Sequence, residues 1–200
     1  VGTRERDLHF YRDGEFTVFN AAAGMPTGVI RALCAEQNGD VWIGMERFPL
    51  VRLHEGRAAP VPDAPPDAFM IVPAATGIWA ATADGRLMRG DASGFADRTP
   101  SVPDGDRIRC LFAGDDGTLW IGFASGGLGR LVEPDSFRFF PTDLGPRAAA
   151  IVQIVADEDG WLWCGTPRGI LRLRIADLAA PGADGPTGAH SVLCGVGDGW

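Results

Sequence analysis

A tryptophan recurs four times along this chain at nearly even intervals. Each one follows a strand-like run, and the intervals are 37, 41 and 43 residues: Trp42, Trp79, Trp120 and Trp163. A repeat near 40 residues, built of short strands and glycine-rich turns, is typical of the four-stranded antiparallel blade of a β-propeller. The spacing therefore predicts an all-β chain made of such blades.

An Asn-Gly or Asp-Gly pair precedes three of these tryptophans. The pairs are Asn38-Gly39, Asp116-Gly117 and Asp159-Gly160. Both residue types accept positive φ, which favours the type I′ turn of a β-hairpin. We therefore expect a hairpin at each pair, with an inner strand that is nearly apolar and buried on both faces. The second repeat, Ala75-Thr76-Gly77, lacks the pair and is interpreted as a degenerate blade.

The repeats divide the chain into blades of one propeller region, residues 1–200. Four blades are fairly complete and two are partial: 1–20 as outer strands, 28–62, 67–98, 107–141, 150–178, and 190–200 as an inner strand. Both ends fall inside a repeat, so the chain is interpreted as an incomplete excerpt of a longer array. The alternative is a closed five-bladed ring, since propellers of four to eight blades occur.

The charge balance narrows the classes of partner. The chain has 18 Lys and Arg against 26 Asp and Glu, a net charge of -8. This acidity argues against nucleic acid or an anionic membrane as the main partner. Its apolar stretches are far shorter than the roughly 20 residues of a membrane-spanning helix.

The most regular repeats carry a recognisable pattern. They are Asp116-Gly117-Thr118-Leu119-Trp120-Ile121-Gly122 and residues Asp159 to Thr166, the latter followed by Gly169-Ile170-Leu171-Arg172-Leu173. The pattern resembles the two-component regulator propeller repeat, and the resemblance covers nearly the whole chain. It implies a non-catalytic sensor propeller, usually of seven blades, in the periplasmic part of a bacterial hybrid histidine kinase or related regulator. A secreted or cytoplasmic location is the alternative.

The same resemblance implies partners. They are a neighbouring propeller and signalling domains of the same protein, with dimerisation of the full-length protein. The expected ligand is a small polar molecule or a carbohydrate. Loops between second and third strands and the inner strands would bind it through charge-assisted hydrogen bonds. The candidate ligand-binding residues are Arg31, Arg47, Asp84, Arg109 and Arg168.

The tryptophans, cysteines and histidines of the sequence do not indicate a catalytic or metal-binding site. The tryptophans are interpreted as packing between blades rather than as a ligand-stacking set. The cysteines fall in expected core strands without metal-ligand spacing: Cys34, Cys110, Cys164 and Cys194. The three histidines, His9, His54 and His190, occupy unrelated points of the repeat, and the sequence assembles none of them with a carboxylate. No catalytic residue, metal site or cofactor is therefore expected.

Two other functions stay open. One is a secreted propeller enzyme of the streptogramin lyase type, whose repeats also carry Asp-Gly-x-Leu-Trp. That family needs a paired histidine site with magnesium, which the corresponding strands of this chain lack. The other is a purely structural propeller that binds proteins.

Overall fold

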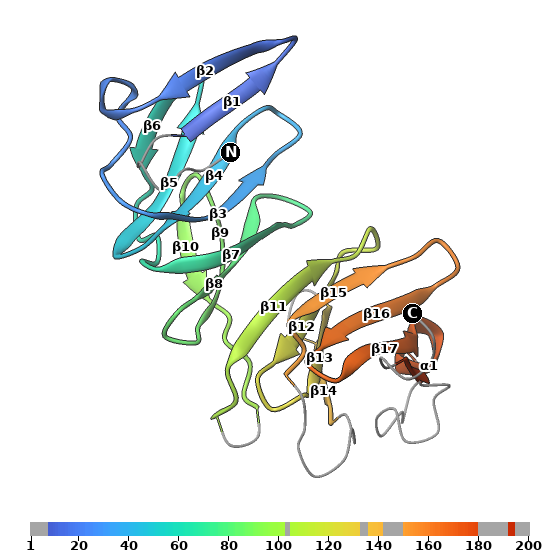
Figure 1. Ribbon diagram of the computed structural model, residues 1–200. Helices are drawn as coiled ribbons and strands as arrows, with labels where there is room; N and C mark the ends of the chain where they lie inside the picture. Colours follow the sequence, from blue (N-terminus) through green and yellow to red (C-terminus); the bar gives the residue numbers. More distant parts are fainter. Residues whose placement is uncertain (1–7, 103–104, 133–135, 142–149, 180–191, 195–200) are drawn as a thin grey trace. The chain divides into compact units, whose positions relative to one another are not determined.

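The computed structural model describes residues 8–102, 105–132, 136–141, 150–179 and 192–194. The chain divides into two compact units, Val1–Thr99 and Pro100–Trp200, and each is considered by itself. In both units antiparallel strands that follow one another in sequence pair into sheets (Figure 1). The chain is an all-β protein built of propeller blades, as the tryptophan spacing predicts.

The first unit contains a hairpin and two four-stranded sheets. The hairpin is β1 (Leu8–Arg12) and β2 (Glu15–Phe19), and the short helix η1 (Ala21–Ala23) follows it. The first sheet is β3 (Ile30–Ala35), β4 (Val41–Met45), β5 (Phe48–His54) and β6 (Arg57–Pro60). The second is β7 (Ala68–Pro73), β8 (Ile78–Thr82), β9 (Leu87–Asp91) and β10 (Gly94–Asp97).

The second unit contains two more sheets of the same kind. One is β11 (Ile108–Ala113), β12 (Thr118–Phe123), β13 (Leu128–Val132) and β14 (Ser136–Phe140). The other is β15 (Gln153–Ala156), β16 (Trp161–Thr166), β17 (Gly169–Arg174) and β18 (Val192–Cys194), with helix α1 (Ile175–Ala179) after β17. No helix among the described residues is long and apolar enough to cross a bilayer.

One strand lies where the repeat alignment does not put it. The alignment assigns residues 190–200 to the inner strand of a further blade, whereas β18 pairs with β17 as the outermost strand of the fourth sheet. This pairing satisfies backbone N–H and C=O groups at an edge of β17 that would otherwise lack partners. The rest of that segment, like residues 1–7 of the partial first blade, lies outside the described residues.

The hairpins form at the predicted pairs, but their turns are not of type I′. Glu36 N donates to Asp40 O at 2.9 Å, which leaves a three-residue loop in which only Gly39 has a positive φ, of 91°. Gly117 and Gly160 repeat this arrangement at 79° and 80°. The conformation is a type I turn followed by a left-handed glycine. The side chain of Asn38 holds it by accepting from the backbone N of Asp40 at 2.9 Å.

The core of the first unit lies on both faces of its first sheet. On one face Trp42, which is 1% exposed, packs against strands β7 to β10 and meets Phe95 edge-on, with ring centroids 5.8 Å apart. On the other face Ile43 and Val51 pack against Leu8 of the hairpin. Burying such large side chains supplies most of the stability of a blade stack.

The inner strands are less buried than their apolar sequences suggest. Leu33 of β3 is 37% exposed and Val155 of β15 is 45% exposed, so these strands are not buried on both faces. The hairpin cluster that covers the sheet opposite Trp42 does not include Leu33. An apolar inner strand therefore indicates which residues are suited to burial, and the neighbouring sheet decides whether they are buried.

A glycine after each Trp-Ile pair lets the next sheet approach. A Cβ added at Gly44 would collide with the carbonyl oxygen of Ala68, where β7 begins. One at Gly122 would lie 2.8 Å from the carbonyl oxygen of Ile151, just before β15. Both glycines lack positive φ, so close packing between blades, rather than backbone conformation, requires them here.

Candidate functional site

The five residues that the sequence selects are distributed over both units. Arg31 is exposed on β3 and pairs with Glu46 across 2.8 Å. Arg47 has a φ of 58°, and its backbone N donates to Asp67 Oδ1 at 2.6 Å, which ties the β4–β5 loop to the start of β7. These two arginines therefore lie at one end of the first sheet.

The remaining three are Asp84 of the first unit, next to Ala83, whose backbone N donates to the Asp67 carbonyl, and two arginines of the second unit. Asp84 accepts hydrogen bonds from Thr82 Oγ1 and from Arg86 Nε, the latter at 2.9 Å, and the Thr82 bond is the main cause that lowers the pKa of Asp84. Arg109 and Arg168 are exposed in the second unit. None of the five lines either of the two pockets described below. Their role in binding stays a prediction.

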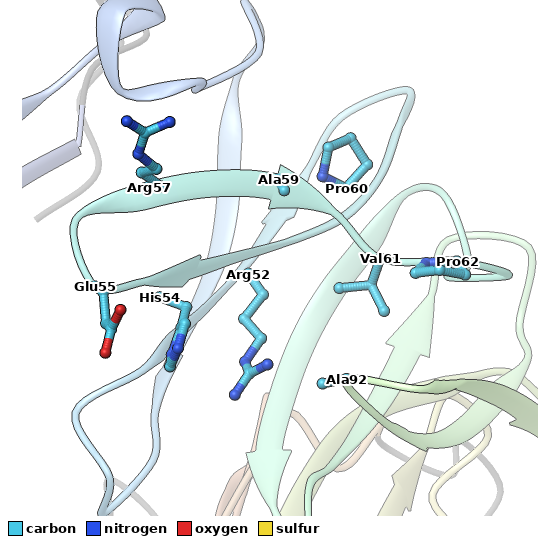
Figure 2. A pocket seen from close by; sticks show the side chains of 9 residues that line it. All are labelled: Arg52, His54, Glu55, Arg57, Ala59, Pro60, Val61, Pro62 and Ala92. Atoms are coloured by element: carbon cyan, nitrogen blue, oxygen red, sulfur yellow. The ribbon is translucent and has the colours of Figure 1, made fainter.

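The structure shows instead a groove in the first unit, along the outer strands of its first sheet. It has a volume of about 400 Å³. The hairpin β5–β6, the segment after β6 and the β9–β10 turn form its walls (Figure 2). Its lining residues are Arg52, His54, Glu55, Arg57, Ala59, Pro60, Val61, Pro62 and Ala92.

A buried carboxylate lies behind the groove. Asp40, whose side chain is 4% exposed, accepts hydrogen bonds from Arg52 Nη2 and from His54 Nδ1, the latter at 2.6 Å. Burial by itself raises the pKa of Asp40, but the hydrogen bonds from His54 and Arg52 outweigh it, so its pKa lies below the ordinary value. Because a carboxylate only accepts, His54 carries a proton on Nδ1 and its Nε2 remains for another partner.

The basic side chains of the groove come from the two paired strands of one hairpin. In the β5–β6 register Arg52 is opposite Ala59, and His54 is opposite Arg57. Residues directly opposite each other in an antiparallel pair point to the same side of the sheet. Figure 2 shows Arg52 and His54 directed to one side of Ala59 and Arg57 to the other, so basic groups flank the floor of the groove.

Sequence reasoning missed this cluster, although a signal for it exists. The hairpin pairs Val41 with Leu53, which brings the residue before Val41, Asp40, beside the residue after Leu53, His54. Those two are 14 residues apart in the chain, so no local motif links them. Extending the predicted hairpin by one residue at each end would have assembled the pair.

A second pocket, of about 280 Å³, lies in the second unit between β11–β12 and the turn after β15. It is acidic, but two of its carboxylates already serve the turns. Asp116 accepts from both the backbone N and the hydroxyl of Thr118, at 2.9 Å each. Asp157 accepts from Trp163 Nε1 at 2.7 Å, and this bond is the main cause that lowers the pKa of Asp157. These contacts indicate a structural role.

The comparisons with known proteins identify the fold. No family model matches the chain, and no curated protein matches it. Among solved structures, virginiamycin B lyase from Staphylococcus aureus is 18% identical with a TM-score of 0.67. That match covers 96% of this chain and 64% of the lyase, so the chain spans just under two thirds of the lyase.

Extracellular domains of signalling proteins are also similar. One, from a B. thetaiotaomicron protein assigned to a one component system, is 13% identical with a TM-score of 0.70 and is matched over 94% of this chain and 25% of its own. Another, assigned to a hybrid two component system of B. thetaiotaomicron, is 18% identical with a TM-score of 0.62, over 82% and 23%. At these identities the similarity shows the fold alone, which is that of a β-propeller.

Proposed function

We propose that this chain is the ligand-binding, non-catalytic propeller of a bacterial two-component signalling protein, located in the periplasm. The repeat around Asp116 to Gly122 resembles that of two-component regulator propellers. The similarity to extracellular domains of signalling proteins supports the same function at the level of the fold. In such a protein the ligand acts by binding one signalling state more tightly than the other.

The groove of the first unit is the observation that carries the proposal. The groove is lined by both charged and apolar side chains, and the sheets that carry them pack on a buried core. Small-molecule sites usually have this construction. The described residues that line it include no serine, threonine or cysteine that could act as a hydroxyl or thiol nucleophile beside His54. Asp40, which orients His54, is also held by Arg52. The arrangement suits recognition of a polar ligand better than its conversion.

Two measurements test this function. Small polar compounds are titrated into the chain by calorimetry, and each bound compound is then recovered and analysed by mass spectrometry. We expect binding with the compound returned unchanged. In cells that express the complete gene, the same compound should change the output of a transcriptional reporter. Conversion of the compound, or a reporter that responds equally when the groove is blocked by Ala59→Trp, would contradict the proposal.

Similarity to virginiamycin B lyase carries a second candidate function, the opening of streptogramin antibiotics. The observation in its favour is the match over 96% of this chain. Of the histidines that such chemistry would need as a pair, His9 lies on β1 and His54 on β5, in different sheets, and His190 lies outside the described residues. Incubation with quinupristin, followed by chromatography, distinguishes the two functions: we expect the antibiotic to remain intact.

A further inference from the structure

We propose that the groove between hairpin β5–β6 and the β9–β10 turn binds a ligand that carries a carboxylate. This inference names the ligand class of the groove and rests on the proposed function. Arg57 is the group that recognises the carboxylate, Arg52 and His54 offer N–H donors on the other side of the floor, and Val61, Pro62 and Ala92 contact the rest of the molecule.

Basic side chains lie on both strands of hairpin β5–β6. Arg57 stands directly opposite His54 across the hairpin, and Arg52 follows on the same face. Arg57 carries a permanent positive charge, and an anion bound beside it would accept charge-assisted hydrogen bonds. No hydrogen bond or ion pair to the Arg57 guanidinium occurs within the described part of the chain, so its donors are available to a ligand.

The carboxylates of Asp40 and Asp91, near the groove, already accept hydrogen bonds from within the chain. The Asp40 carboxylate is turned inward and already accepts from both Arg52 and His54, so one negative charge serves two basic side chains. Asp91, the last residue of β9, accepts from the backbone N and the hydroxyl of Ser93, and these bonds are the main causes that lower its pKa, with the charges of Arg89 and Arg52 lowering it further. Glu55, in the turn of the hairpin, is the one acidic residue among those that line the groove.

The volume of the groove and the residues of its walls suit a small carboxylate. A volume of about 400 Å³ accommodates a molecule of amino-acid or monosaccharide size. Arginine binds carboxylates through two parallel N–H donors, and Arg57 offers such a pair at the groove. The exposed prolines and Ala92 present apolar surface opposite these donors.

Matched ligand pairs test the inference in calorimetric titrations of the whole chain. Glucuronate is compared with glucose, and glutamate with glutamine, because each pair differs mainly in a carboxylate. We expect at least one carboxylate to bind at least tenfold more tightly than its neutral analogue. Arg57→Ala should weaken that binding about tenfold or more, the usual value of a charge-assisted hydrogen bond. Arg107→Ala, which removes an exposed arginine of the other unit, is the control and should leave the affinity unchanged.

Glu55→Gln should change the affinity for the carboxylate in the direction opposite to Arg57→Ala. It removes the repelling charge and should strengthen carboxylate binding several-fold, whereas a merely structural hairpin would not show this gain. Equal affinities for acid and neutral partners, or no effect of Arg57→Ala in a chain with unchanged circular dichroism, would overturn the ligand class while leaving a binding function intact. Conversion of the ligand would instead overturn the proposed function.

Discussion

Trp42 and Arg52 face each other across β4 and β5, with the guanidinium carbon 5.9 Å from the centre of the indole ring. The relationship recurs in every four-stranded sheet. The corresponding distances are 5.5 Å for Arg89 over Trp79, 5.8 Å for Arg130 over Trp120 and 4.8 Å for Arg172 over Trp163. The Nε atoms of Arg52, Arg130 and Arg172 are buried without a hydrogen-bond partner among the described residues, and the indole ring lies beside each guanidinium.

The fourth sheet should depend most strongly on this pair. Arg172 lies 3.8 Å from the ring of Trp161 as well as 4.8 Å from that of Trp163. Arg172→Met should therefore lower the free energy of unfolding by about 1–2 kcal/mol, and Arg130→Met by about 0.5–1 kcal/mol. Urea denaturation followed by tryptophan fluorescence measures both. An equal effect of the two variants would show that the second indole contributes nothing.

The glycine after the tryptophan should be essential only where another sheet covers it. A Cβ at Gly122 meets the carbonyl oxygen of Ile151 at 2.8 Å, whereas the nearest atom to one at Gly165 is Gln153 Cβ at 3.4 Å. Gly122→Ala should destabilise the chain by about 1–3 kcal/mol through overpacking, and Gly165→Ala by less than about 1 kcal/mol. Thermal unfolding of the two variants gives the comparison. A tolerated Gly122→Ala would contradict the close approach of the sheets.

Asp40 should make the free energy of unfolding depend on pH in the acidic range. Its pKa is lowered from the ordinary value of 3.8, so its stabilising effect is fully present above that value and is lost as the pH falls through the lower value of the folded state. At pH 7 Asp40→Asn should cost about 1–3 kcal/mol, because charge-assisted bonds to Arg52 and His54 weaken. Urea unfolding at pH 7 and pH 3 tests this: the deficit should shrink at pH 3. Asp115→Asn, an exposed carboxylate, is the control.

The buried cysteines should react only in the unfolded chain. Burial raises the pKa of Cys34 to about 11 and those of Cys110 and Cys164 to about 12, so thiolate is scarce near neutral pH. In a Cys194→Ser background, iodoacetamide at pH 8 should label none of the three within minutes and all of them in urea. Rapid labelling of native protein, read by mass spectrometry, would show that these strands open locally.

The sequence predicts the parts of this fold that depend on local chemistry. Trp42 and its equivalents lie on the second strand of each sheet, and three of the four follow a turn that an Asn-Gly or Asp-Gly pair specifies. The turn type was predicted wrongly, because the Asn38 side chain caps a longer loop. Asp40 and His54 meet only after strand register is known, and the exposure of Leu33 depends on which sheet lies beside it. Strand pairing sets the contact between Asp40 and His54, and packing between sheets sets the exposure of Leu33. The composition and the spacing of residues in the sequence reveal neither.

The Trp–Arg pair also bears on how a chain of this kind can change. Each sheet carries its own pair between its second and third strands, and each covered sheet adds a glycine that admits its neighbour. The tryptophan that packs on the next sheet and the glycine that admits that sheet therefore lie within a single repeat of about 40 residues. A duplicated repeat would carry both features with it, so we expect genes of this type to gain or lose blades as whole repeats.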